Sequence, residues 1–251
     1  MLDHSSDVNI TESRRSSGRR ARTDWRLGGR TVRAWREWLL AVSLVALGLG
    51  VLLGAAVSAA WPGPAASVFA TVVVVGGMMA PIVWGFTRSR PAGLLRFRPT
   101  DLLWGVGLGV ALCLVRGVIT GGEFPSFTTL GGLPPAEWWI VDAFGGIFVA
   151  PVVEELFFRG ILLVSVFTLL RRPVGYVAAG AVAALVSTGL FILLHAVTAG
   201  TDPTDITSLA MLGFIAAGIV LLTGRIWGAI LLHAVFNTAA VAIGLIGASL
   251  G

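Results

Sequence analysis

Residues 138–170 read WWIVDAFGGIFVAPVVEELFFRGILLVSVFTLL, an apolar run with Glu154, Glu155 and Arg159 near its middle. A membrane-spanning helix needs about 20 apolar residues to cross about 30 Å of hydrocarbon, so this run is longer than one crossing requires. Pro151 has no backbone N–H, and it therefore removes a helix hydrogen bond beside Glu154. The sequence predicts one long helix that is kinked at Pro151 and extends past the bilayer.

The composition of the whole chain is that of a membrane protein. Of its 251 residues, 56% are hydrophobic and 12% are charged, and the mean hydropathy is +0.88. A water-soluble domain carries roughly 25% charged residues, so the soluble classes are excluded. The single cysteine, Cys113, excludes a disulfide scaffold and a metal site built from cysteines.

The fold class predicted from these apolar runs is all-α, a polytopic bundle of transmembrane helices. Backbone groups in lipid must pair within their own segment, which makes each run a helix. Seven spans are predicted. An eighth is the alternative, and it would place Arg171, Arg172 and Arg225 on the wrong side of the membrane. The predicted spans are Trp38–Ala60, Ala65–Phe86, Leu102–Thr120, Trp138–Leu170, Val174–Val197, Ile206–Thr223 and Trp227–Ala248.

Residues 1–37 form a separate, basic segment. They hold nine arginines against five acidic residues, a net charge of +4, and have little apolar periodicity. This composition predicts a disordered head. Arginine beside a first span favours a cytoplasmic N-terminus and attracts anionic membrane lipids, which explains the charge better than nucleic-acid binding does. We expect a multi-pass protein of the plasma (cell inner) membrane.

The charged residues inside the long run carry the functional hypothesis, because an ionisable group within a span is costly. Glu155 and Arg159 are one helical turn apart and are expected to form an ion pair. Glu154 points about 100° away, where its own helix offers no partner. An unpaired carboxylate in this position is a candidate general base. The alternative is a buried Glu–Arg pair that only locks helix packing.

Two histidines lie in later spans and provide further polar groups. His195 and His233 occupy the same hexapeptide, ILLHAV, and Asn237 follows His233 by one turn. We expect these side chains to converge with Glu154 on one cavity. The predicted spans conflict with this, because they run parallel and place His195 roughly 30 Å deep but His233 only about 9 Å deep. A break near residues 187–189, a strong tilt, or different span boundaries would be needed.

These residues resemble three motifs of the CPBP family, which includes type II CAAX prenyl endopeptidases and bacterial bacteriocin-processing or self-immunity proteins. Residues 154–159, EELFFR, resemble its EExxxR motif, Phe191 to His195 its FxxxH motif, and His233 to Asn237 its HxxxN motif. The resemblance covers Trp138–Ala248. The chain then divides into the head (1–37), three N-terminal transmembrane helices (38–120) and a CPBP-like protease domain (138–248).

The resemblance implies an intramembrane endopeptidase acting on a peptide or a lipidated protein. Glu154 would activate the attacking water, and Glu155 and Arg159 would support it. His195, His233 and Asn237 would bind and polarise the site. Zinc held by the two histidines and one glutamate is one form of this site. A metal-free mechanism uses the same residues, and no HExxH motif is present.

Two other functions compete with proteolysis. One is a non-catalytic immunity or scaffold protein that keeps the polar cluster for helix association. The other is a small transporter using Glu154 and the histidines as a proton relay. Transporters usually carry internal repeats, and here only the six-residue ILLHAV echo is found. The sequence assigns neither the substrate nor the oligomeric state.

Overall fold

The computed structural model describes residues 23–28, 30–61, 63–121, 138–200 and 202–250, and these residues contain helices and no strand. The predicted all-α fold is therefore confirmed. Within these described ranges, six helices are long and apolar enough to cross a membrane. They are α2 (Glu37–Ala60), α3 (Pro64–Arg88), α4 (Pro99–Ile119), α8 (Tyr176–Thr198), α9 (Pro203–Thr223) and α10 (Trp227–Leu250).

The predicted long helix is present as four consecutive helical segments. These are η3 (Trp139–Val149), α6 (Ala150–Glu155), η4 (Leu156–Leu162) and α7 (Leu163–Leu170), and η3 and η4 are π-helical. At the end of η3, the N–H of Ala150 bonds the carbonyl of Gly145, five residues earlier. Wide π turns on both sides of α6 therefore accompany Pro151, where a simple kink was predicted.

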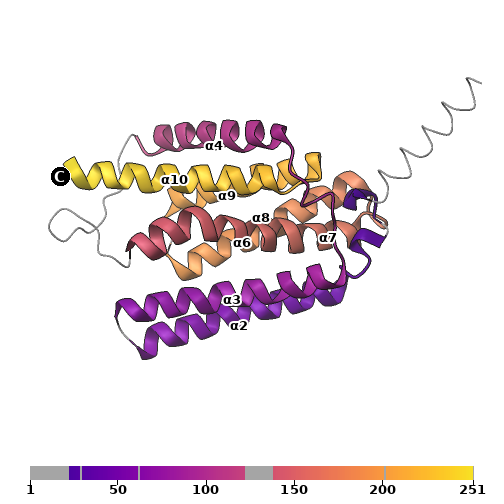
Figure 1. Ribbon diagram of the computed structural model, residues 1–251, viewed down its shortest axis with the longest axis horizontal. Coiled ribbons are helices and arrows are strands. Elements are labelled where there is room, and N and C mark those ends of the chain that lie inside the picture. The colour runs from indigo at the N-terminus through magenta and orange to yellow at the C-terminus, as the bar shows by residue number, and fades with distance from the viewer. Residues whose placement is uncertain (1–22, 29, 62, 122–137, 201, 251) are drawn as a thin grey trace, which may run out of the picture.

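The long helix lies between two helix pairs (Figure 1). On one side α2 and α3 form a hairpin, and on the other α4 packs along α10. Both pairs meet through glycines. A Cβ on Gly77 of α3 would lie 2.7 Å from the Ala46 carbonyl oxygen, and one on Gly105 of α4 would lie 2.4 Å from Leu231 Cβ. Close backbone approach of this kind is the usual way in which helices associate in lipid.

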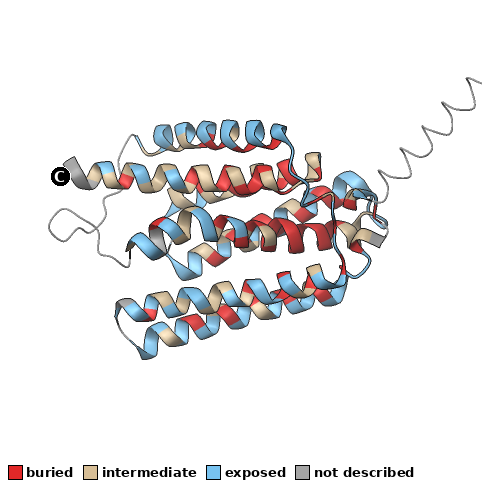
Figure 2. Ribbon diagram, viewed as in Figure 1, coloured by how far each residue is buried: buried red, intermediate tan, exposed pale blue. Residues whose placement is uncertain are grey.

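The most buried part of the molecule is the second half of the long helix (Figure 2). Leu156 is partly buried, and every residue from Phe157 to Phe167 is buried. The outward faces of α2, α3 and α4 carry exposed leucine, valine and phenylalanine side chains. Large apolar side chains on the outside are expected of a protein solvated by lipid.

Part of the head, predicted to be disordered, is folded. Residues 23–35 (residue 29 excepted) form a cap at one end of the bundle, with two short helices, η1 (Trp25–Leu27) and η2 (Arg30–Val32). Trp25, Val32 and Trp35 of this cap are buried. Burial of two tryptophans supplies the apolar contact that a purely polar segment lacks. Residues 1–22 lie outside the described residues.

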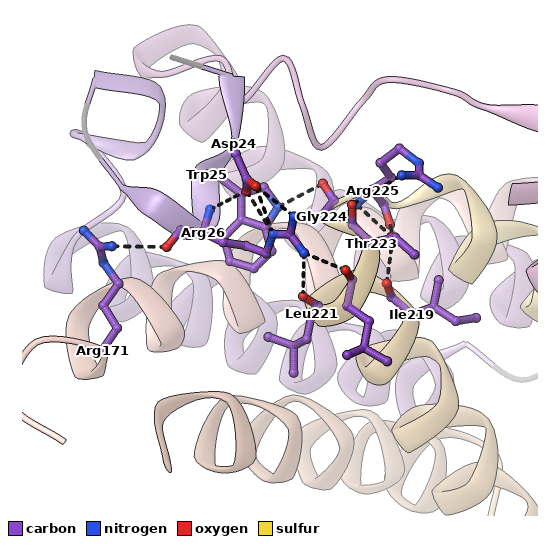
Figure 3. Close-up of polar contacts among 10 residues, drawn as sticks. Asp24, Trp25, Arg26, Arg171, Ile219, Leu221, Thr223, Gly224 and Arg225 are labelled. Carbon is purple, nitrogen blue, oxygen red and sulfur yellow. Dashed lines mark hydrogen bonds and ion pairs between the residues drawn. The ribbon is translucent and has the colours of Figure 1, made fainter. Parts of the chain in front are cut away.

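Hydrogen bonds tie the cap to the ends of the spans (Figure 3). Trp25 Nε1 donates to the carbonyl of Gly224 at 3.0 Å. The Arg26 guanidinium donates to the carbonyls of Leu221 and Leu222, the last turn of α9. It also bonds Asp24, which raises the pKa of Arg26. These bonds satisfy carbonyls that a helix terminus leaves without partners.

Candidate active site

Glu155, Arg159 and His233 form one buried network. Arg159 Nη1 donates to Glu155 Oε1 at 2.9 Å, which confirms the predicted ion pair. His233 Nδ1 lies 3.0 Å from the same oxygen. The Arg159 guanidinium also lies over the ring of Phe191, 4.5 Å from its centroid. The carboxylate therefore fixes an arginine from its own helix and a histidine from α10.

Glu154 faces both histidines. Its Oε2 lies 3.8 Å from His195 Nε2 and 3.9 Å from His233 Nε2, so α8, α10 and the long helix converge at this oxygen. No hydrogen-bond partner of Oε2 is found among the described residues. The Glu154 side chain is 12% exposed, whereas that of Glu155 is fully buried. The two adjacent glutamates thus have different environments: the Glu154 side chain is partly exposed although its Oε2 is buried, and Glu155 is fully buried in the ion-pair network.

The second nitrogen of each histidine is held by an acceptor. His195 Nδ1 lies 2.9 Å from the carbonyl oxygen of Phe191, and His233 Nδ1 faces the Glu155 carboxylate. A carbonyl oxygen only accepts, so His195 must carry its proton on Nδ1 when neutral. Pairing at Nδ1 orients each ring and directs Nε2 toward Glu154.

The donor types at this point fit a zinc ion, which accepts histidine nitrogen and carboxylate oxygen. The held Nδ1 atoms match the second-sphere pattern of zinc-bound histidines. The spacing is wider than in a tetrahedral site, whose ligand atoms lie about 3.4 Å apart. Among the residues that the structure describes, no three His, Cys, Asp or Glu side chains are close enough to hold a metal as placed.

An offset between α8 and α10 accounts for about half of the predicted difference in depth between His195 and His233. Tyr176, at the start of α8, packs on Phe167 with ring centroids 5.0 Å apart. Ile226, just before α10, lies against Gly160. The two contact points are seven residues (167 − 160) apart on the long helix, or about 10 Å. The break near residues 187–189, one of the three alternatives, is absent, since α8 is continuous there. The predicted spans placed the starts of α8 and α10 at the same depth in the membrane, and this was wrong.

Asn237 is near the site but is engaged by the backbone. Its Nδ2 donates to the carbonyl of Gly146 at 2.7 Å. Gly146 precedes Pro151 by five residues, and a π turn would pair its carbonyl with an N–H at position 151 that proline lacks. Asn237 thus satisfies a carbonyl that Pro151 leaves free, and it joins α10 to η3. The structure does not direct this amide donor at Glu154.

Gly213 is a site residue that the sequence reasoning missed. A Cβ there would lie 2.5 Å from Thr188 Cγ2 and 3.2 Å from Arg159 Nη2. Gly213 therefore leaves room for the arginine that holds Glu155. A glycine in an apolar run gives no polar signal by which this role could be found.

Comparison with known proteins gives one match. Residues 136–239 match the family model described as type II CAAX prenyl endopeptidase, Rce1-like. The matched segment includes Glu154, His195 and His233, and it ends before the resemblance predicted to reach Ala248. No curated protein and no solved structure gives a significant match to the chain.

Proposed function

We propose that this chain, a multi-pass membrane protein that belongs to the Rce1-like family of type II CAAX prenyl endopeptidases, is an intramembrane endopeptidase. Its substrate is a peptide bond in a membrane-associated or lipidated polypeptide. The observation that carries the proposal is the placement of Glu154 Oε2, which lies within 4 Å of both histidine Nε2 atoms and has no hydrogen-bond partner among the described residues.

Glu154 is the base in this mechanism. A water bound at Oε2 gives its proton to the carboxylate as its oxygen adds to the carbonyl carbon of the scissile bond. The C–N bond then breaks, and Glu154 returns the proton to the leaving amine. In its imidazolium form His195 carries a proton on both ring nitrogens, so Nε2 can donate to the developing oxyanion while Nδ1 keeps its bond to the Phe191 carbonyl. The products are a carboxylate and an amine.

Glu155 and Arg159 act by position. Glu155 Oε1 accepts from both Arg159 and His233 and so keeps the His233 ring directed at Glu154. A histidine paired to a carboxylate in this way retains one orientation and one tautomer. Neither Glu155 nor Arg159 is exposed enough to meet a substrate.

A zinc ion is compatible with the donor types and would be held by Glu154, His195 and His233. Bound there, it would supply a Lewis acid for the scissile carbonyl. Elemental analysis of purified protein tests this form of the site. One zinc per chain, lost in His195→Ala/His233→Ala, supports it. Absence of zinc from an active preparation leaves the metal-free form.

A non-catalytic scaffold or immunity protein is favoured by one observation, the fully buried Glu155–Arg159 pair with its bonded His233. Buried ion pairs of this kind specify packing in some proteins. The scaffold function does not account for the position of Glu154 Oε2, which lies between two imidazoles and bonds neither. We therefore place the scaffold second.

Peptide hydrolysis in H₂¹⁸O is the experiment for the reaction class. The purified protein in liposomes is mixed with a library of lipidated peptides, and the masses of the fragments are measured by mass spectrometry. We expect cleavage with one ¹⁸O in the new carboxylate, and no cleavage in protein-free liposomes. Intact peptides throughout would favour a scaffold or transporter.

The orientation proposed for the protein places the cap in the cytoplasm. The exposed arginines described by the structure gather at the cap end of the bundle, and cytoplasmic loops are enriched in arginine. They are Arg33, Arg36, Arg88, Arg90, Arg96, Arg98 and Arg172. At the opposite end, Arg116 is paired with Asp205 at 3.0 Å. The membrane is proposed to be the plasma membrane of a bacterium.

A further inference from the structure

The candidate site is closed toward the cap. Between Glu155 and the cap, the long helix presents Phe157, Phe158, Ile161 and Leu162, whose side chains are fully buried. Beyond them, Trp25 and its neighbours in the cap cover the bundle end and bond the last turn of α9. In the described residues, tightly packed apolar layers thus separate Glu154 from the cytoplasmic end.

The site is exposed on the other side. Glu154 and His195 are 12% and 26% exposed at their side chains, whereas His233 is 3% exposed. Exposure is therefore confined to the pair formed by the long helix and α8. His195 lies three residues before the end of α8 at Thr198, so the accessible edge is close to the turn between α8 and α9.

Helix packing explains why the site is exposed there. α8 packs extensively on α7 and η4, and the described residues show no packing of comparable extent between α8 and α6 or η3. His195 lies 3.8 Å from Glu154 and only three residues before α8 ends, so α8 reaches the level of Glu154 and leaves η3 beyond it uncovered. Gly146 of η3 is about two turns earlier on the long helix, and a Cβ there would meet nothing within 4 Å. An extended peptide backbone needs this kind of clearance to approach a carboxylate.

We infer that the substrate polypeptide reaches Glu154 between the end of α8 and η3, from the half of the membrane opposite the cap. We call this place the α8–η3 entrance, bounded by Gly146, His195 and Ala199. With the cap in the cytoplasm, the entrance lies in the outer half of the bilayer. The substrate is then a membrane-anchored polypeptide whose scissile bond is on the extracytoplasmic side. Of the two tests below, only the measurement of peptide cleavage rests on the proposed endopeptidase function.

Single-cysteine variants test the entrance. With Cys113→Ala as background, Ala199→Cys places a thiol on the His195 face of α8, one turn farther along, where the chain is exposed. Val174→Cys is the matched control, 49% exposed at the opposite end of α8. A membrane-impermeant maleimide is added to intact cells and again after permeabilisation. We expect Ala199→Cys to react in intact cells and Val174→Cys to react only after permeabilisation.

Activity completes the test. Modified Ala199→Cys is expected to cleave a lipidated peptide at least tenfold more slowly than its unmodified form, and modified Val174→Cys at an unchanged rate. Reaction of Ala199→Cys only after permeabilisation would overturn the inference, and so would full activity after modification. Labelling does not require catalysis, so the sidedness result stands even where no variant, including wild type, cleaves a peptide.

Discussion

Two adjacent glutamates on one helix lie in different environments because their neighbours differ. Glu155 is locked by Arg159 and His233, whereas Glu154 Oε2 faces two imidazoles without a direct bond. The ion pair was predictable from the four-residue spacing alone. The histidine partners were not, since they come from α8 and α10 and depend on the offset between those helices.

Replacing Glu155 by Gln leaves the Arg159 charge buried without its partner. Removing one member of a buried pair typically costs about 3–5 kcal/mol. We expect Glu155→Gln to lower the thermal unfolding temperature in detergent markedly. Glu37→Gln, an exposed glutamate at the start of α2, is the control and should unfold like wild type. Equal unfolding temperatures for all three proteins would contradict the network.

Gly213 provides a second test at this scale. A methyl group at Gly213 would lie 2.5 Å from Thr188, whereas one at Gly218 on the same helix would meet nothing within 4 Å. Overpacking of this kind costs about 1–3 kcal/mol. Gly213→Ala should therefore lower both the unfolding temperature and the cleavage rate, and Gly218→Ala should change neither. Identical behaviour of the two variants would argue against the packing of α9 on Arg159.

At the scale of elements, η3 and α10 are joined by a hydrogen bond to a backbone carbonyl that would otherwise have no donor. Pro151 leaves the carbonyl of Gly146 without a backbone donor, and Asn237 supplies one. The loss of a helix hydrogen bond at Pro151 is predictable from the sequence. The π turns are not, because they depend on tertiary contacts along the whole helix.

The two residues should be coupled energetically. Asn237→Ala leaves the Gly146 carbonyl unpaired and is expected to cost about 1–3 kcal/mol. In a Pro151→Ala background the new N–H at position 151 can take that carbonyl, so the same change should cost less. A double-mutant cycle of unfolding free energies measures the coupling. Additive costs would rule out the compensation described here.

Span limits were predicted to within a few residues. α4 begins at Pro99, three residues before the predicted Leu102, because the Asp101 carboxylate accepts from the Arg98 N–H and so satisfies a donor of the first turn. Hydropathy alone does not detect such polar first turns. The offset of α8 and α10, on which the site depends, is likewise set by packing against Phe167 and Gly160.

At the scale of the molecule, the cap holds the ends of several spans together. Trp25 contacts Phe167 of the long helix with ring centroids 5.4 Å apart and bonds the Gly224 carbonyl after α9. The high arginine content of residues 1–37 favoured a prediction of disorder. That prediction gave too little weight to Trp25 and Trp35, whose burial anchors residues 23–35. Composition averages over a segment, whereas folding depends on where its few large apolar side chains lie.

Trp25→Ala should therefore destabilise the whole bundle. Truncation of a buried tryptophan costs about 3–5 kcal/mol. Trp38→Ala is the matched control, because Trp38 is 74% exposed. We expect limited proteolysis to cut Trp25→Ala near its N-terminus faster than wild type, and to cut Trp38→Ala at the wild-type rate. Equal protection of Trp25→Ala would show that the cap is dispensable.

The catalytic role of Glu154 is tested most directly by the rate at which Glu154→Gln cleaves a lipidated peptide. The change keeps the shape of the side chain and removes the base, whose contribution is typically 10²–10⁴-fold. We predict a loss of at least about 100-fold with a wild-type unfolding temperature, while Glu37→Gln keeps full activity. A folded Glu154→Gln protein that cleaves at the wild-type rate would contradict the account.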